Sequence, residues 1–240
     1  MVTDEVSTNA FLAIRAGDLT ALHDLLTAHP ELAACRLGGP ARGRTPLHVV
    51  TDWPGFFPNG PHIAQLLIDT GATVDARGPD GTGETPLHWA ASSDDADVAR
   101  VLIGAGADVN AAGGSIGTVL DNAVGYGCWN VARLLVECGA RVDKPWLAAS
   151  LGLLDRLQEL LVDPATATGS AIDQAFWHAC AGGQRRAAEL LRHHGADLSF
   201  TPDYGHGTVL DVAHNHSTQR ANLIEWLEQQ GVRRAGTPEL

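Results

Sequence analysis

The stretch Glu84-Thr85-Pro86-Leu87-His88-Trp89-Ala90-Ala91 decides the fold, together with Gly106-Ala107-Asp108-Val109-Asn110-Ala111, which begins fifteen residues after its last alanine. Thr-Pro can open a short helix, because a threonine hydroxyl caps a helix and proline is tolerated in its first turn. The two alanines allow a second helix, expected over Val98–Ile103, to pack close. Gly106 is expected to end that helix. The block therefore predicts one helix-turn-helix unit.

The same pattern recurs along the chain. It starts again at Thr45, Thr118 and Thr208, and Thr85 to Thr118 is a step of thirty-three residues. This period and the Thr-Pro-Leu-His motifs resemble those of ankyrin-repeat proteins. The segment Thr45–Gly60 is also similar to that of compact bacterial stand-alone ankyrin proteins. The resemblance implies an all-α ankyrin-repeat solenoid of about six to seven helix-turn-helix units with short hairpin loops.

Because each unit of a solenoid buries its faces only against its neighbours, the sequence predicts a single ankyrin-repeat domain over residues 1–240 with no internal boundary. Weaker motifs mark its ends as capping units. The expected units are an N-terminal cap at 1–36, repeats at 40–76, 80–112, 113–144, 145–166 and 170–200, and a C-terminal cap at 205–240.

The step between the units that begin at Thr45 and Thr85 is longer than the thirty-three residues from Thr85 to Thr118. Thr45 to Thr85 spans forty residues, and about five of the extra residues fall at 54–58, a Pro-Gly-Phe-Phe-Pro sequence between the two helices of its unit. The other two fall in the glycine-rich loop 78–83. Two prolines and a glycine cannot continue a helix, so segment 54–58 must loop out. It carries Phe56 and Phe57 with it and follows Trp53.

Composition limits the class of partner and the location. The formal net charge is −12 and the pI is near 5.2, which disfavours nucleic acid because a negative field repels phosphates. The first residues carry no basic segment followed by an apolar run, and no apolar run approaches the roughly 18 residues of a membrane span. We therefore expect a cytoplasmic monomer that binds neither nucleic acid nor membranes. The four cysteines lack C-x-x-C spacing and are interpreted as free, buried thiols.

Ankyrin proteins commonly hold a partner in a concave groove, lined by the two residues that follow the alanine pair of each first helix. By resemblance these residues include Asp52/Trp53, Ser92/Ser93 and Gly125/Tyr126 here. The neighbouring helix–helix turns would add aromatic and acidic side chains. The predicted partner-binding residues are Trp53, Phe56, Phe57, Ser92, Ser93, Asp94, Tyr126, Trp129 and Trp177.

Two functions remain open. The first is a non-enzymatic module that docks a protein or peptide in the groove, as the fold generally implies. The second is a small-molecule site or a cofactor-independent acid–base enzyme under loop 54–58. In the enzyme, Asp52 or Asp95 would be the general base and His178 or Tyr126 its acid partner, and tryptophan walls formed by Trp53 and Trp129 would raise the pKa of the base.

Structural roles compete with these functional ones. The aromatic side chains of the insertion can instead cover exposed helix edges, and Asp94-Asp95 can be a solvated turn. His48 and His88 hold the motif position that in ankyrin proteins bonds to backbone between adjacent units, a position taken by aspartate at Asp121 and Asp211. No zinc-ligand spacing and no Walker lysine occurs, so neither a metal nor another cofactor is expected.

Overall fold

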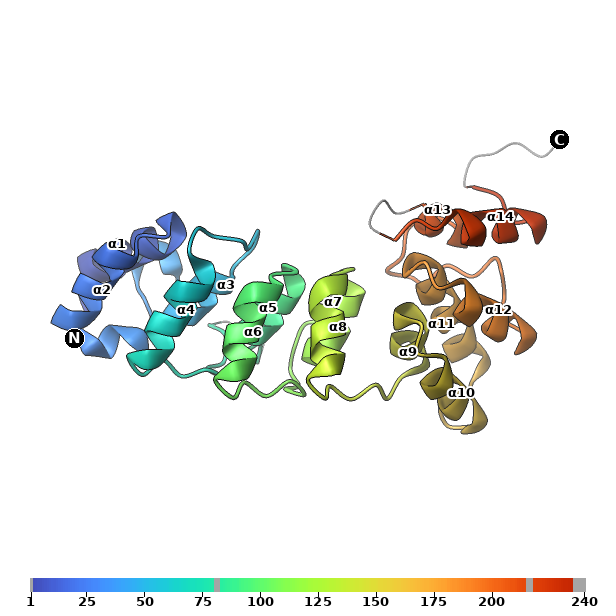
Figure 1. Ribbon diagram of the computed structural model, residues 1–240, viewed down its shortest axis with the longest axis horizontal. Helices are drawn as coiled ribbons and strands as arrows, with labels where there is room; N and C mark the ends of the chain where they lie inside the picture. The colour runs from blue at the N-terminus through green and yellow to red at the C-terminus, as the bar shows by residue number, and fades with distance from the viewer. Residues whose placement is uncertain (1, 80–82, 215–217, 235–240) are drawn as a thin grey trace. The chain divides into compact units, whose positions relative to one another are not determined.

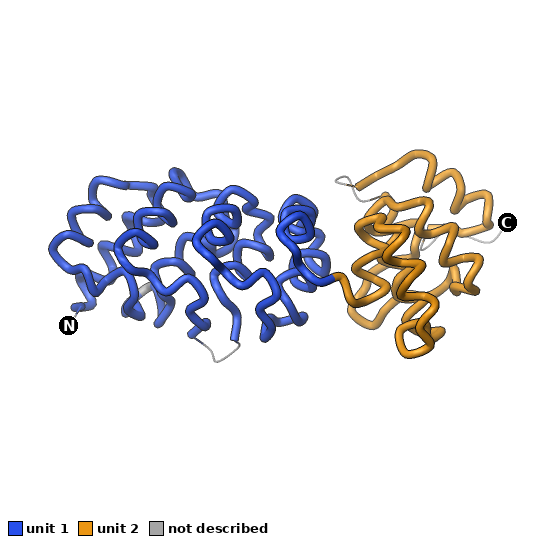
Figure 2. The backbone as a smooth tube through the Cα atoms, turned by 60° about the horizontal axis from the view of Figure 1, so that its bottom comes forward, with its two compact units in different colours: residues 1–141 blue, residues 142–240 orange. Residues whose placement is uncertain are grey.

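The computed structural model describes residues 2–79, 83–214 and 218–234, and this part of the chain is all-α, with no strand. It forms two compact units, Met1–Arg141 and Val142–Leu240, coloured separately in Figure 2. The prediction of one domain without an internal boundary stays a prediction. Residues 80–82 of the expected loop 78–83, and residues 215–217 and 235–240 of the expected C-terminal cap, lie outside the described residues.

The first unit is a stack of four helix pairs (Figure 1). The first helices of the pairs contact one another in one layer, and the second helices do so in another. This is the predicted helix-turn-helix repeat arrangement. The pairs are α1 (Asp4–Ala16) and α2 (Leu19–Ala28), α3 (Pro46–Thr51) and α4 (Gly60–Asp69), α5 (Pro86–Ser92) and α6 (Ala96–Gly104), and α7 (Val119–Gly125) and α8 (Trp129–Glu137). The short 3₁₀ helices η1 (Pro30–Ala33) and η2 (Gly39–Ala41) lie between the first two pairs.

The threonine of each motif caps its helix. The Thr45 hydroxyl accepts a hydrogen bond from His48 N at 3.4 Å, and Thr118 accepts one from Asp121 N at 3.3 Å. The residue three positions later returns a bond: Thr118 N donates to Asp121 Oδ2 at 2.7 Å, as Thr85 N donates to His88 Nδ1 at 3.1 Å. Aspartate and histidine are therefore interchangeable at this position as acceptors that complete a capping box.

The predicted bond between adjacent units is confirmed for His48. Its Nε2 lies 3.2 Å from the carbonyl oxygen of Glu84, in the next repeat, and its Nδ1 lies 2.7 Å from the Thr45 hydroxyl. Because a carbonyl only accepts, Nε2 carries the proton and Nδ1 accepts from Thr45. For His88 the corresponding contact is weaker: its buried Nε2 forms no hydrogen bond of normal geometry among the described residues. Burial lowers the pKa of the His88 ring, and the Gly117 backbone of the next repeat acts on the ring in the opposite direction and raises its pKa by less.

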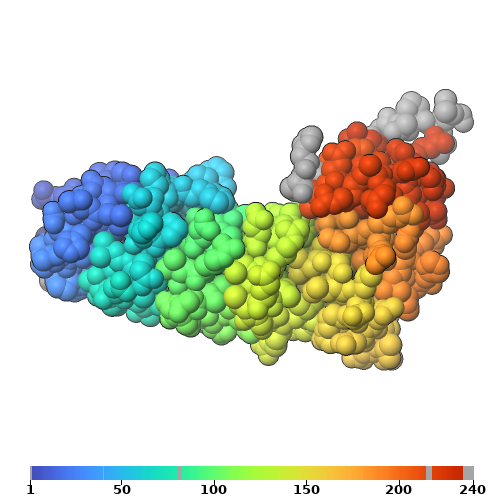
Figure 3. All heavy atoms as spheres, viewed as in Figure 1, coloured from blue at the N-terminus to red at the C-terminus, as the bar shows by residue number. Residues whose placement is uncertain are grey.

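The insertion is tied to the repeats on both sides. It occupies the segment between Thr51, the last residue of α3, and Gly60, the first of α4. The side-chain amide of Asn59 donates to the Gly17 carbonyl in the preceding repeat at 2.8 Å, and Phe56 N donates to Asp95 Oδ2 in the following one at 2.9 Å. In the space-filling view this light-blue segment, which follows α3, stands beside the green atoms of α5 (Figure 3).

The second unit contains three further helix pairs among its described residues. They are α9 (Pro145–Leu151) and α10 (Leu154–Val162), α11 (Gly169–Ala181) and α12 (Arg185–His193), and α13 (Val209–Ala213) and α14 (Ala221–Gln229). Its core is built on alanines and leucines around the fully buried Phe176. Small residues here permit close helix packing: a Cβ atom on Gly182, which directly follows the last residue of α11, would lie 2.1 Å from the Ser150 carbonyl oxygen of α9.

The cysteines differ from the expectation that all four are buried. Cys128 and Cys180 are buried, and burial raises the pKa of the Cys128 thiol to about 11. Cys35 is half-buried and Cys138 is exposed. Cys138 is exposed because it follows the last residue of α8, in the turn that leads out of the helix. All four are free thiols.

Candidate functional site

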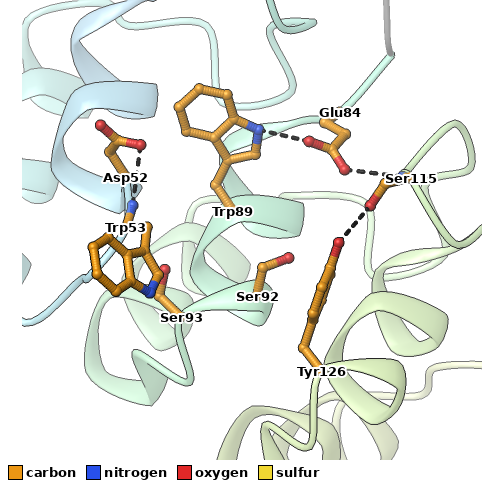
Figure 4. Close-up of a pocket in the computed structure, with 8 residues that line it drawn as sticks. All are labelled: Asp52, Trp53, Glu84, Trp89, Ser92, Ser93, Ser115 and Tyr126. Atoms are coloured by element: carbon orange, nitrogen blue, oxygen red, sulfur yellow. Dashed lines mark hydrogen bonds between the residues drawn. The ribbon is translucent and has the colours of Figure 1, made fainter. Parts of the chain in front are cut away.

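One cavity of the first unit collects most of the predicted groove residues (Figure 4). Its volume is about 270 Å³. Side chains from the ends of α3, α5 and α7 and from the loop before α7 surround it. We call it the Glu84 cavity, and its lining residues are Asp52, Trp53, Glu84, Trp89, Ser92, Ser93, Ser115 and Tyr126.

The Asp52 carboxylate is neutralised. Its Oδ2 forms ion pairs with Arg44 and, at 3.4 Å, with Arg15. Its Oδ1 accepts a hydrogen bond from the backbone N–H of the next residue, Trp53, at 3.0 Å, just after the end of α3. A carboxylate held by two guanidinium groups lacks the desolvated, unpaired setting that the acid–base hypothesis requires of its general base.

Glu84 is the second carboxylate of the cavity, and the Trp89 indole lies between it and Asp52 (Figure 4). Its Oε2 accepts the indole N–H of Trp89 at 2.9 Å, and its Oε1 accepts Ser115 N at 2.9 Å and the side-chain amide of Asn122 at 3.2 Å. Burial alone would raise the pKa of Glu84, but these hydrogen bonds outweigh it and lower the pKa. Glu84 is therefore ionised at neutral pH.

All the donors to Glu84 are neutral. Among the residues that the structure describes, no lysine or arginine forms an ion pair with its carboxylate. The guanidinium of Arg44 lies 6.0 Å from the centre of a Trp89 ring, but its charge is paired with Asp52. The cavity thus contains one neutralised carboxylate and one whose negative charge has no cationic partner within the described part of the chain.

Large exposed aromatic side chains border the cavity. Trp53 is 77% exposed and Tyr126 is 55% exposed, and the Tyr126 hydroxyl lies 3.2 Å from Ser115 Oγ. Phe56, at 66%, is also exposed, on the insertion, and Ile116 follows Ser115 with 44% exposure. Exposed apolar groups that gather in one place indicate an interaction surface more strongly than scattered ones.

Two predicted carboxylates serve the backbone instead of the cavity. Asp95 is 2% exposed, and it caps α6 by accepting Val98 N at 3.1 Å while it also accepts Phe56 N. Asp94 accepts Asn130 N and Val131 N of the next repeat, both at 2.9 Å. Asp94 thereby caps α8, whose own N-cap residue Cys128 makes no side-chain capping bond. The roles of Asp94 in partner binding and of Asp95 as a base stay predictions that this placement does not favour.

The remaining aromatic side chains of the first unit also lie away from the cavity lining. Phe57 is half-buried beneath Arg15, whose guanidinium carbon lies 4.2 Å from the ring centre. Trp129 is buried, and its indole N–H has no partner among the described residues. Of the aromatic side chains in the insertion and its flanks, Trp53 lines the cavity, whereas Phe57 contacts Arg15 of the preceding repeat.

Trp177 and His178 belong to the second unit. His178 is buried, its Nε2 lies 3.0 Å from the Tyr204 hydroxyl, and its ring is 4.7 Å from that of Trp146. Burial lowers the pKa of His178 to about 4, so the ring is neutral at physiological pH. Trp177 is half-buried beside it. The hypothesis that pairs His178 with Asp52 or Asp95 joins residues of the two units, and it stays a prediction.

Three lining residues were not predicted: Glu84, Trp89 and Ser115. The Trp89 ring contacts that of His48 edge-on, with 4.8 Å between the ring centres, and its indole also forms part of the cavity. Glu84 and Ser115 lie in the segments just before α5 and α7. The position of Glu84 directly before the Thr85 motif, beside the helix that supplies Ser92 and Ser93, was the available signal.

Two searches of the described residues were negative. No group of three or more His, Cys, Asp or Glu side chains is placed to hold a metal ion within the described ranges. None of the helices in these ranges has the length and apolar character needed to cross a membrane.

Comparison with known proteins agrees with the geometry of the repeats. A family profile described as "Ankyrin repeats (3 copies)" matches residues 10–113. An ankyrin repeat and KH domain-containing protein of Caenorhabditis briggsae is 27% identical over 216 residues, which cover 84% of this chain and 8% of that protein. Human ankyrin repeat and SOCS box protein 16 is 32% identical over 186 residues, covering 57% of this chain and 40% of that protein. The chain thus spans well under half the length of these curated relatives.

A solved structure shows the same fold. The ankyrin repeat domain of Bcl-3 superimposes with a TM-score of 0.53 at 24% sequence identity, over 92% of this chain and 97% of that one. The family profile covers the first three helix pairs in full or in part, where the Thr-Pro-Leu-His motifs are strongest. Together, the motifs, the stacked helix pairs and the profile match show that residues 10–113 of the chain are ankyrin repeats.

Proposed function

We propose that the chain binds a protein partner, and that a segment of that partner lies across the Glu84 cavity. Ankyrin repeats are in general protein-interaction modules. The observation that carries the proposal is the exposure of Trp53 and Tyr126 on two repeats that border one cavity. Aromatic side chains dominate the binding energy of many interfaces because they bury large areas at small entropic cost.

The test is selection of random 12-residue peptides displayed on phage against the full chain, followed by affinity measurement. Trp53→Ala is expected to weaken the selected peptides by at least about tenfold, which is about 1.4 kcal/mol, because truncating an aromatic hot-spot residue costs about 2 kcal/mol or more. Leu12→Ala is the control, since Leu12 is also an exposed apolar residue but borders a different depression on α1 and α2. Equal affinities for the wild type and Trp53→Ala would contradict the proposal.

A small-molecule site in the same cavity is the second candidate. The hydroxyl groups of Ser92, Ser93, Ser115 and Tyr126 converge on it and can orient a polar ligand, as small-molecule pockets commonly do. Mass spectrometry of compounds that co-purify with the chain tests this candidate. A compound enriched with the wild type and lost in Trp53→Ala would support it. A bacterial source, a cytoplasmic location and a monomeric state stay predictions from the sequence.

A further inference from the structure

We propose that the Glu84 cavity receives a lysine side chain of the bound segment, with its ammonium group against Glu84 and the aromatic rings. The inference rests on the proposed protein-binding function and names the chemistry of the partner. Its basis is a charged carboxylate that has no cationic partner among the described residues and lies in an aromatic-walled cavity.

The first step is the electrostatics of Glu84. The carboxylate is half-buried and held ionised by the Trp89 indole, the Ser115 amide and the Asn122 side chain, none of which carries a charge. A partly desolvated negative charge that lacks a counter-charge attracts a cation more strongly than an exposed carboxylate does. The formal net charge of −12 adds a long-range field of the same sign.

Three aromatic side chains form walls of the Glu84 cavity. Trp53 and Tyr126 expose their rings at the cavity, and Trp89 forms its third aromatic side (Figure 4). The face of an aromatic ring attracts an ammonium group by roughly 0.5–2 kcal/mol, increasing as the site is desolvated. Aromatic walls beside a carboxylate therefore favour a cation with an alkyl stem over a neutral polar group or an anion.

The third step distinguishes lysine from arginine. Both oxygens of Glu84 already accept hydrogen bonds, Oε2 from Trp89 and Oε1 from Ser115 and Asn122. The planar fork of a guanidinium needs two matched acceptor directions, whereas an ammonium is a compact charge with three rotatable donors. The hydroxyl oxygens of Ser92 and Ser115 offer acceptors for its other hydrogens. The acceptors that remain therefore suit the compact ammonium group of lysine better than the planar guanidinium group of arginine.

The direct experiment is a titration of the full chain, labelled with ¹⁵N, with Nα-acetyl-lysine methylamide, observed at the indole N–H signals of Trp53 and Trp89 and the backbone signal of Ser115. Nα-acetyl-norleucine methylamide has the same carbon chain without the ammonium group. We expect saturable shifts with the lysine ligand and at least tenfold weaker binding of the norleucine ligand. Equal binding of the two ligands would overturn the proposal, and so would no shift with either ligand.

Two variants test whether the Glu84 carboxylate is the charge that attracts the lysine ligand. Glu84→Gln removes the charge but keeps an acceptor for the Trp89 indole, and it is expected to weaken the lysine ligand about tenfold and leave norleucine binding unchanged. Glu137→Gln, on the exposed end of α8, changes the net charge equally and is expected to have little effect. Equal weakening by both variants would show a general field effect and overturn the assignment to Glu84. Because Glu84→Gln also changes the acceptor of three local hydrogen bonds, the wild-type comparison of lysine with norleucine tests the proposal independently of this variant.

The two proposals fail in different ways. If the selected peptides require Trp53 but bind equally well when every lysine is replaced by norleucine, the lysine proposal is overturned and protein binding stands. If no peptide is selected, the protein-binding proposal is contradicted, whatever the titration with the lysine ligand shows.

Discussion

Replacing Asp95 by alanine is expected to lower the free energy of unfolding by about 3 kcal/mol, because hydrogen bonds to charged groups contribute roughly 1.5–3 kcal/mol each. The buried carboxylate accepts Val98 N in the first turn of α6 and Phe56 N in the insertion. The variant leaves both amides without this partner. Denaturation in urea measures the loss, and hydrogen exchange at the Val98 and Phe56 amides locates it.

Two further variants make the Asp95 result specific. Asp95→Asn is expected to retain much of the stability, since asparagine caps helices about as well as aspartate. Asp97→Ala is the matched control on the same helix: its exposed carboxylate pairs with Arg100 at 3.0 Å, and such surface pairs contribute under about 1 kcal/mol. A loss from Asp95→Ala no larger than that from Asp97→Ala would show that the carboxylate is not structural.

Acid is expected to destabilise the first unit through His48. Burial lowers the pKa of His48 from 6.5 to about 4. Below pH 6.5 the unfolded chain binds a proton at His48, whereas the folded chain does not bind it until about pH 4. The contribution of neutral His48 to the free energy of unfolding is therefore fully present above pH 6.5 and is lost as the pH decreases toward 4. At 1.36 kcal/mol for each pH unit, the loss between pH 7.5 and 4.5 is about 2.5 kcal/mol from this residue.

The variant His48→Gln separates this contribution from that of the carboxylates. Glutamine can still donate to the Glu84 carbonyl but does not titrate, so the stability difference between wild type and variant should shrink by about 2.5 kcal/mol between pH 7.5 and 4.5. Urea denaturation at both pH values, on either side of the pI near 5.2, provides the measurement. A difference that is constant with pH would show that His48 titrates normally in the folded state.

His178 provides an independent comparison in the second unit. Burial also lowers its pKa to about 4. Since the two histidines lie in different units, His48→Gln should leave the acid sensitivity of hydrogen exchange in α11 unchanged. Stability in repeat arrays is a sum of local terms, which makes such local measurements more informative than a single unfolding midpoint.

The repeat architecture could be predicted from the sequence because its signals are local. Threonine followed by proline specifies the start of α3 and α5, an alanine pair follows in α5, and the thirty-three-residue step aligns α5 with α7. The loop at 54–58 followed from the excess length and from its prolines. The placement of the insertion against Gly17 of the preceding repeat and Asp95 of the following one could not be predicted. It depends on hydrogen bonds between repeats, which join residues far apart in the sequence.

The candidate site was predicted in part for the same reason. Asp52, Trp53, Ser92, Ser93 and Tyr126 lie at equivalent positions of successive repeats, so a repeat alignment brings them together. Glu84 and Ser115 precede the aligned motifs, and their meeting depends on the fold of the connecting segments. The ion pairs of Asp52 could not be predicted from the sequence either, because Arg15 and Arg44 belong to different repeats.

Asp94 has a consequence for anyone who would rebuild this array. The start of α8 is completed by a side chain from the preceding repeat, with Asp94 in a left-handed conformation at φ 56°. The unit that contains α7 and α8 is therefore not a self-sufficient module. A shuffled or shortened array that places another repeat before it must supply an acceptor at the same turn, or replace Cys128 with a residue that caps its own helix. The boundary for grafting lies inside the preceding repeat, and it does not coincide with the sequence period.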